Sequence, residues 1–364
     1  MSLTFYDNAR SYEKNFEKGP PLASQNITPP KRTIKKTSKF LGFDINLPFG
    51  IPAGPLLNAK FVKSAFEWGF DVIHYKTQRS GVFSCNPFPN VLFVEVNGNL
   101  TLEKANKPLL GQLKTKKKPL EFNITNSFGN PSKGPAFWQE DMKKALRYEG
   151  KGQLLIASVV GTIKKGFSEE DYYNDFAKTA KLAKETGVKV IEVNLSCPNV
   201  ANEGVLCYSL EAVEAIVKKT KEKIGETPLL VKVGYYAKSQ QKLLENIVRR
   251  IEPFIAGIAA INTIPAPVVD EKGSQALPGP NRLKAGICGA GIKWAGLDMV
   301  QRLARLRDKL HADYEIVGVG GVMTPSDYRK YRKAGADAVQ SATAAMWNPY
   351  LAYEIWKQNK HPLS

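Results

Sequence analysis

Residues 190–199 read VIEVNLSCPN, and the first seven of them indicate the fold. They form an apolar run with a polar end, as expected of a parallel strand that is covered on both faces. Side chains alternate along a strand, so Ile191, Val193 and Leu195 should lie under helices while Asn194 points to the opposite face. The stretch therefore predicts one strand of a parallel sheet with a polar residue at its carboxyl end.

Seven further apolar runs share this pattern, at residues 48–54, 72–78, 153–161, 229–234, 257–264, 315–321 and 338–343. Amphipathic stretches and short Gly/Pro breaks separate them. In residues 208–223, for example, Leu210, Val213 and Ile216 share one helical face and lysines occupy the other. Eight such βα units predict an α/β fold, a closed (β/α)8 TIM barrel in which Asn194 points toward the barrel axis.

Polar residues collect at the carboxyl ends of these predicted strands. They are Lys76, Thr77, Asn194, Ser196, Lys232, Asn262, Thr263, Gly320, Gly321, Ser341 and Thr343. A polar group in a buried strand costs free energy unless it finds a partner, so its presence needs a reason. Because the active sites of such barrels lie at this end of the strands, the placement predicts an enzyme.

Two segments extend this barrel. Residues 1–45 are expected to form an irregular N-terminal arm, and residues 46–364 the barrel domain. Between the second and third strands, Val91–Val96 and Leu100–Leu102 flank an Asn-Gly-Asn sequence, which is a hairpin signal. We therefore expect a small β excursion over the mouth of the barrel.

Composition narrows the class of protein. No run of about 18 or more apolar residues is present, and the polar N-terminus lacks the apolar core of an export signal. The four cysteines, Cys85, Cys197, Cys207 and Cys288, form no C-x-x-C pair. This argues against a zinc site or an iron–sulfur cluster held by this chain. We expect a cytoplasmic protein with no metal and no membrane segment.

The net charge of +18 is unusual and has two interpretations. It could attract nucleic acid or an anionic membrane, or it could reflect a lysine-rich solvated surface. The basic residues are spread out, apart from the run at residues 114–118, which favours the second interpretation. Nucleic acid is therefore not expected as a partner, whereas attraction of an anionic substrate is consistent with either interpretation.

Cys197 follows the strand quoted above and should lie on a loop at the barrel mouth. A lone cysteine is more often a buried structural residue than a reactive one. At a barrel mouth, however, a thiol with a free pKa of ~8.5 is easily poised for proton transfer near neutral pH. The histidines His74, His311 and His361 are expected to be structural.

The motif N-L-S-C-P-N at residues 194–199 resembles the signature of class 1 dihydroorotate dehydrogenases. In that class the cysteine is the catalytic base, whereas class 2 enzymes have serine at this position. The resemblance implies an FMN-dependent oxidation of (S)-dihydroorotate to orotate in de novo pyrimidine synthesis. Cys197 would take a proton from C5 of the substrate while a hydride leaves C6 for flavin N5.

Other motifs of that family follow in the same order. FGIPAG at residues 49–54 resembles the first-strand flavin motif, NPFP at 86–89 the segment after the second strand, and NSFG at 126–129 the substrate loop. By this resemblance the substrate-binding residues are Lys76, Asn126, Phe128, Gly129, Asn194, Asn199, Asn262 and Thr263. The cofactor-binding residues are Ala53, Gly54, Lys76, Thr77, Asn194, Lys232, Ile261, Gly291, Gly320, Gly321, Ala342 and Thr343.

The chemistry of these residue types agrees with the resemblance. Orotate presents ring carbonyls and N–H groups, and an asparagine amide offers both a donor and an acceptor. Glycine turns after the last two strands can present N–H groups to a phosphate, and Lys232 could stabilise negative charge on a reduced flavin. Three positions depart from the family pattern: Asn130 and Ser132 in the substrate loop, and Ala342 where glycine is usual.

Other functions remain open at this point. A dihydropyrimidine dehydrogenase-like enzyme would share the chemistry, and an RNA dihydrouridine synthase-like enzyme also places Cys-Pro after a barrel strand. The latter would need an RNA-binding domain, which does not follow the eighth unit here. A catalytically silent phosphate-binding barrel would not need Cys197 together with four asparagines.

The electron acceptor is also open, and could be fumarate or a partner redox subunit. The arm and the lysine-rich residues 103–120 have no counterpart in the compact class 1 enzymes. The basic arm also lacks the apolar helical pair with which class 2 enzymes reach membrane quinone. The family resemblance implies a homodimer.

Overall fold

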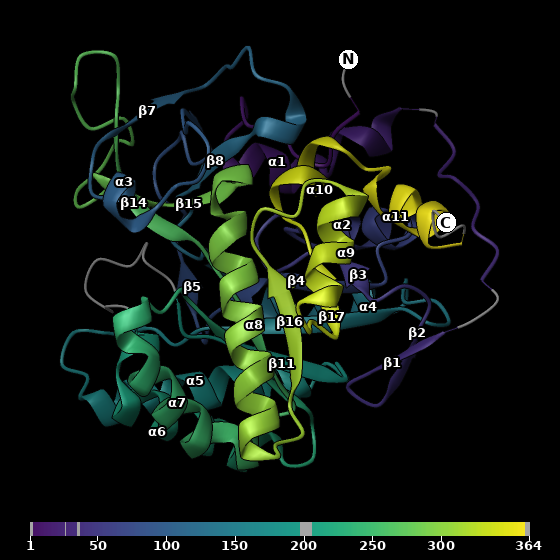
Figure 1. Ribbon diagram of the computed structural model, residues 1–364, viewed down its shortest axis with the longest axis vertical. Coiled ribbons are helices and arrows are strands. Elements are labelled where there is room, and N and C mark those ends of the chain that lie inside the picture. The colour runs from purple at the N-terminus through teal and green to yellow at the C-terminus, as the bar shows by residue number, and fades with distance from the viewer. Residues whose placement is uncertain (1–2, 26, 35–36, 197–205, 361–364) are drawn as a thin grey trace.

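The computed structural model describes residues 3–25, 27–34, 37–196 and 206–360, and its centre is an eight-stranded parallel sheet (Figure 1). The strands are β3 (Phe49–Gly50), β4 (Val72–Gln78), β10 (Leu154–Val159), β11 (Val190–Asn194), β12 (Leu229–Val233), β13 (Gly257–Ala260), β16 (Glu315–Val319) and β17 (Ala338–Gln340). Their order in the sheet is β3-β17-β16-β13-β12-β11-β10-β4. Each of the eight predicted apolar runs thus contains one strand, and the predicted fold is confirmed.

Backbone hydrogen bonds join the first and last strands of this sheet. Asp71 N–H donates to Phe49 O at 3.0 Å, and His74 N–H donates to Ile51 O at 2.9 Å. Because β3 and β4 are the two ends of the strand order, these bonds close the sheet into a barrel.

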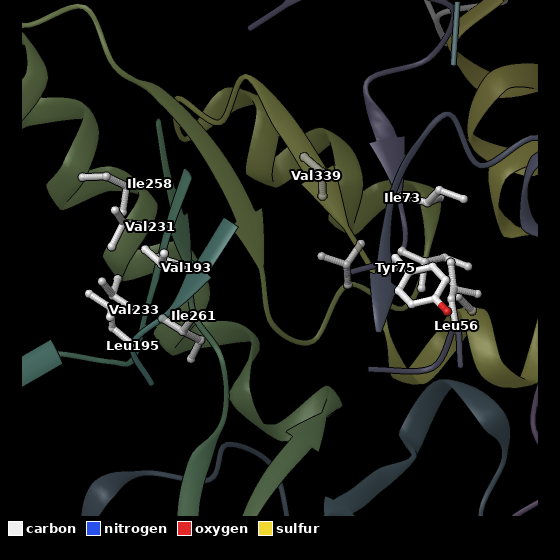
Figure 2. Close-up of a cluster of buried hydrophobic side chains, with 14 of the residues drawn as sticks. Leu56, Ile73, Tyr75, Val193, Leu195, Val231, Val233, Ile258, Ile261 and Val339 are labelled. Atoms are coloured by element: carbon white, nitrogen blue, oxygen red, sulfur yellow. The ribbon is translucent and has the colours of Figure 1, made fainter. Parts of the chain in front are cut away.

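Helices cover the outside of the barrel. They are α2 (Ala59–Glu67), α4 (Pro135–Leu146), α5 (Glu169–Lys184), α6 (Leu210–Ile224), α7 (Gln241–Ile251), α8 (Lys293–Leu310), α9 (Pro325–Lys333) and α11 (Leu351–Lys360). Their apolar faces meet alternate side chains of the strands, and Figure 2 shows Val193, Val231 and Ile258 within this buried cluster. Ile191, Val193 and Leu195 belong to it together with Val213 and Ile216 of α6, as the alternation predicted.

The other face of the strands fills the barrel interior with a second apolar cluster, which includes Val72, Leu154, Ile156, Val190, Leu230, Ala259, Val317 and Ala338. Phe40, Leu41 and Ile45 complete this cluster. They come from an antiparallel hairpin of β1 (Ser38–Phe40) and β2 (Phe43–Ile45), which therefore closes the end of the barrel opposite its mouth.

The N-terminal arm is more regular than expected. Besides the hairpin it contains α1 (Tyr12–Lys18) and the 3-10 turn η1 (Pro21–Ser24). Ser11 begins α1, because its side chain accepts a hydrogen bond from Lys14 N–H. The prediction of an irregular arm was wrong because these elements are short and lack a periodic apolar pattern.

A second, smaller closed sheet forms the β excursion. Its strands are β6 (Phe93–Val94), β7 (Leu109–Gln112), β8 (Asn123–Asn126), β14 (Ile264–Val269) and β15 (Lys284–Gly289). Figure 1 shows β7, β8, β14 and β15 gathered on one side of the barrel, away from the β1–β2 hairpin. The excursion is confirmed, and its second half comes from the segment after β13, which carried no signal that we recognised.

The predicted hairpin around Asn97-Gly98-Asn99 is wrong. β6 pairs with β7 and β8 instead, and Leu102 begins the short helix α3 (Leu102–Ala105). Thr101 caps this helix by accepting a hydrogen bond from Lys104 N–H, while Leu100 N–H donates to Gly291 O. These tertiary and capping bonds outweigh the local turn preference.

Candidate active site

A cavity lies at the carboxyl ends of the barrel strands, beneath the β excursion. The barrel contributes the turns after β3, β16 and β17 and residues of β12, whereas the excursion contributes residues of β8 and β15. Eleven predicted site residues line it: Ala53, Gly54, Asn126, Phe128, Lys232, Asn262, Thr263, Gly320, Gly321, Ala342 and Thr343. The structure thus brings most of the predicted substrate and cofactor positions to one place.

Two buried cations belong to this region. Lys232 lies in the apolar strand β12, is 2% exposed and lines the cavity. Lys76 is 3% exposed, and its Nζ lies 5.8 Å from the ring centroid of Phe128, which is a lining residue. Lysine is almost never fully buried unless it is paired, so each position needs negative or electron-rich groups around it, from the protein or from a ligand.

Asn194, Thr77, Ile261 and Gly129 are not among the residues that line the cavity. Asn194 is buried, and its Oδ1 accepts from Ser196 N–H at 3.2 Å. Thr77 Oγ1 lies 3.0 Å from Ser158 Oγ, and Ile261 N–H donates to Val319 O at 2.8 Å. Gly129 has a φ of +81° and packs closely on Asn86. Cys197 and Asn199 lie outside the described residues.

Gly291, a predicted cofactor residue, is also absent from the cavity lining. Its N–H donates to Asn123 Oδ1 at 2.6 Å, and the neighbours Gly289 and Ile292 line the cavity in its place. The N–H of Gly291 is therefore already engaged within the protein.

Two lining threonines carry hydroxyls suited to a ligand. Thr263 Oγ1 and Thr343 Oγ1 are both buried; Thr263 Oγ1 has no hydrogen-bond partner among the residues that the structure describes, and Thr343 meets only the weakly hydrogen-bonding thiol of Cys288. An unsatisfied buried polar group costs about 1–3 kcal/mol, so a ligand that bonds it gains that much relative to the empty protein. Asn262, which also lines the cavity, donates its Nδ2 to Ser196 O.

The turn after β16 requires glycine, both by its backbone and by its close contact with α8, whereas the segment after β3 is open at Gly54. Gly320 and Gly321 have φ values of +123° and +64°, which side chains other than glycine rarely adopt. A Cβ on Gly321 would lie 2.7 Å from Lys293 Cα at the start of α8, whereas a Cβ on Gly54 would meet nothing within 4 Å. The residues present thus fit a flat, phosphate-bearing group such as FMN.

Sequence reasoning missed several residues of this site. Tyr6 of the arm lines the cavity and stacks edge-on against Phe128 at 5.9 Å, and Cys288 lines it from β15. Arg282 is 5% exposed and donates to Ser127 O at 3.0 Å and to Pro87 O at 2.8 Å, so it ties the predicted substrate loop to the segment after the second strand. Nothing in the local sequence around Tyr6 or Arg282 distinguishes them.

The three described cysteines are held as neutral thiols. Burial raises the pKa of Cys85 to about 12, and it raises the pKa values of Cys207 and Cys288 to about 11. None of these three is therefore prepared to lose a proton near neutral pH.

Comparisons with known proteins agree with this geometry. The family profile described as dihydroorotate dehydrogenase matches residues 107–363. A dihydroorotate dehydrogenase of Dictyostelium discoideum is 35% identical over 373 residues, covering 99% of this chain and 99% of that protein. The dihydroorotate dehydrogenase B (NAD(+)) catalytic subunit of Petrotoga mobilis is 28% identical over 233 residues, covering 64% and 70% of the two chains.

A solved structure supports the fold. It is the dihydroorotate dehydrogenase of Eimeria tenella in complex with ferulenol, with a TM-score of 0.67 at 17% identity, covering 92% of this chain and 88% of that one. Within the described residues, no helix combines the length and apolar character needed to cross a membrane. The full-length relative and the profile that matches most of the sequence together show that this chain belongs to the dihydroorotate dehydrogenase family.

Proposed function

We propose that this chain oxidises dihydroorotate to orotate, with FMN as its cofactor and Cys197 as the base. One observation carries the proposal: a single cavity joins Lys232, Asn126, Asn262, Thr263 and the two glycine- and threonine-bearing turns after β16 and β17. The family to which the chain belongs consists of FMN-dependent flavoenzymes, and the N-L-S-C-P-N motif resembles its class 1 members.

The residues divide into two groups. Thr343, Gly320 and Gly321 are assigned to the phosphate, and Ala53, Gly54 and Lys232 to the ring of FMN. Asn126, Asn194, Asn199 and Asn262 are assigned to the substrate ring, because each amide can pair with a ring carbonyl or a ring N–H. Lys76 and the ring of Phe128 form the adjoining wall, with Lys76 also near the flavin.

Conversion to orotate removes a proton from C5 and a hydride from C6 of the substrate. FMN, when bound, supplies the acceptor for the hydride. Cys197 is assigned the role of taking the C5 proton, because in the sequence it comes directly after β11 and Ser196. The other three cysteines are poorer candidates for a base, because their thiol pKa values lie near 11 or 12. The proposed base thus holds the proton while the asparagines keep the ring in place.

The test is anaerobic reduction of the bound flavin by dihydroorotate, followed by stopped-flow absorbance. Replacing Cys197 by Ala should slow this step by ~10²–10⁴, which is typical for loss of a positioned base, while FMN and orotate still bind. The wild-type rate should rise with pH as the thiol ionises, and Cys197→Ser should move that rise to higher pH.

Cys85→Ala is the matched control, because Cys85 is a neutral thiol outside the cavity lining, and its reduction rate should stay close to that of the wild type. A Cys197→Ala variant that is reduced at the wild-type rate contradicts the assignment of the base. A wild-type protein that binds no FMN contradicts the proposed function as a whole.

The proposal extends to partners. A homodimer is expected, with fumarate or a partner redox subunit as the electron acceptor, in the cytoplasm. Light scattering of the purified protein measures whether it is a dimer. Reoxidation of the reduced enzyme by fumarate without any second protein would favour fumarate, and its absence would favour a redox subunit.

A further inference from the structure

A chain of buried polar side chains crosses the barrel interior from β17 to β11. Gln340 of β17 and His74 of β4 are fully buried, and Glu192 of β11 is 1% exposed. Gln340 Nε2 lies 2.9 Å from His74 Nδ1, and His74 Nε2 lies 3.2 Å from Glu192 Oε2. Neither the proposed proton transfer nor the proposed substrate contacts use these groups, although burying them is costly.

The hydrogen bonds fix the position of the His74 ring. Gln340 Nε2 also donates to Val72 O at 3.0 Å, which fixes the orientation of the amide because its oxygen would repel that carbonyl. The imidazole ring therefore stands between Gln340 and Glu192, with Nδ1 toward the amide and Nε2 toward the carboxylate.

Glu192 lies beside two basic side chains, those of His74 and Lys232. Burial alone would raise the pKa of this carboxyl, but neighbouring His74 and Lys232, with hydrogen bonds from His74 and Ser158, bring the pKa below its ordinary value. In the register of β11 with β12, Glu192 lies opposite Leu230, and Lys232 lies two residues further along β12. Lys232 is thus a nearby buried cation, and it lines the cavity.

We propose that Glu192, held in place by His74 and Gln340, is the buried counter-charge of Lys232 and limits the positive charge that the barrel presents to the flavin. This inference rests on the proposed function, because it needs FMN to lie beside Lys232. Two-electron reduction adds negative charge to the flavin ring, and a fixed anion in a low-dielectric interior opposes that addition. Glu192 is therefore a positioning and tuning residue, since it acts through Lys232.

The experiment is the midpoint potential of the protein-bound FMN, measured by equilibration with reference dyes. Glu192→Gln keeps the shape of the side chain and removes its charge, so the potential should shift to a more positive value. Glu192→Asp keeps the charge, and its potential should stay close to that of the wild type even where its stability falls.

Glu315→Gln is a matched control, because Glu315 is also a partly buried carboxylate of a barrel strand but lies at the end that the β1–β2 hairpin closes. The pKa of Glu315 is raised to about 7, chiefly by burial, so the potentials are compared above that pH, where both glutamates are charged. The control variant should leave the potential unchanged.

An unchanged or more negative potential in Glu192→Gln overturns the inference, as does an equal shift in Glu192→Asp. If Glu192→Gln does not retain FMN, unfolding of the flavin-free protein decides. The loss in free energy of unfolding caused by Glu192→Gln should then be smaller in a Lys232→Met background than in the wild type. Additive losses from the two substitutions would contradict the pairing.

The outcomes separate this inference from the proposed function. A wild-type flavin that dihydroorotate reduces, together with an unchanged potential in Glu192→Gln, removes the inference alone. A wild-type protein whose flavin dihydroorotate does not reduce removes the proposed function.

Discussion

Thr263 follows β13 and Thr343 begins the short helix α10 (Thr343–Trp347), yet each has a buried hydroxyl oxygen at the cavity. The proposed function assigns Thr343 to the phosphate of FMN and Thr263 to the substrate. A hydrogen bond to a charged group is worth about 1.5–3 kcal/mol, and a neutral one about 0.5–1.5 kcal/mol. The two hydroxyls should therefore differ both in the ligand that they serve and in the size of their effect.

Thr343→Val should weaken FMN binding by roughly 10- to 100-fold, measured by fluorescence titration of the flavin-free protein, and leave the KM for dihydroorotate nearly unchanged. Thr263→Val should raise that KM by roughly 2- to 10-fold and leave FMN binding intact. The two variants control each other, because both exchange a buried hydroxyl for a methyl group. Equal effects on both ligands would show that the hydroxyls do not divide as proposed.

At the scale of elements, the β1–β2 hairpin depends on one carboxyl of the barrel. Glu315 Oε1 accepts from Leu41 N–H at 2.9 Å, and burial raises the pKa of Glu315 from 4.5 to about 7. The folded protein therefore keeps this proton to a higher pH than the unfolded chain. The stability linked to Glu315 is fully present below about pH 4.5 and is lost as the pH rises to about 7.

Glu315→Gln should remove this pH dependence, because an amide still accepts from Leu41 N–H but does not ionise. Between pH 4.5 and about 7 the free energy of unfolding of the wild type should fall relative to that of the variant. Urea unfolding at a series of pH values with saturating FMN measures the difference. A difference that stays constant across this range would mean that Glu315 ionises normally in the folded protein.

Sequence could predict the barrel strands because their signal is local. A run such as residues 229–233 is apolar on both faces, and this composition alone separates it from the polar segments around it. The strands of the excursion gave no comparable signal: β6 has two residues, and β14 contains Pro265 and Pro267. Proline is rare inside strands, so β14 reads as a loop until its partners β15 and β7 are known.

The site divides in the same way. Residues at strand ends, such as Lys232 and Thr263, could be predicted because a polar group in an apolar strand is conspicuous. Tyr6 could not, because its place depends on long-range bonds: Phe5 N–H donates to Met346 O at 2.9 Å, and Asn8 Nδ2 donates to Leu113 O at 3.0 Å. The bond from Gly291 N–H to Asn123 Oδ1 could not be predicted either, because it joins residues that are 168 positions apart.

The whole molecule carries a net charge of +18, from 52 Lys and Arg against 34 Asp and Glu, and the proposed substrate is a carboxylate anion. A field of this sign raises the rate of encounter with an anion, and salt screens it. The Debye length shortens from about 30 Å at 0.01 M to about 10 Å at 0.1 M ionic strength, so charges far from the cavity lose their effect first.

The second-order rate of flavin reduction at low dihydroorotate should therefore fall several-fold over this range of ionic strength. The limiting rate at saturating dihydroorotate should stay constant, because it contains no encounter step. Reoxidation by dissolved oxygen is the control, since an uncharged oxidant does not respond to the field. Stopped-flow measurement of both half-reactions makes the comparison, and a second-order reduction rate that is insensitive to salt would show that the charge is a solvated surface without a role in substrate capture.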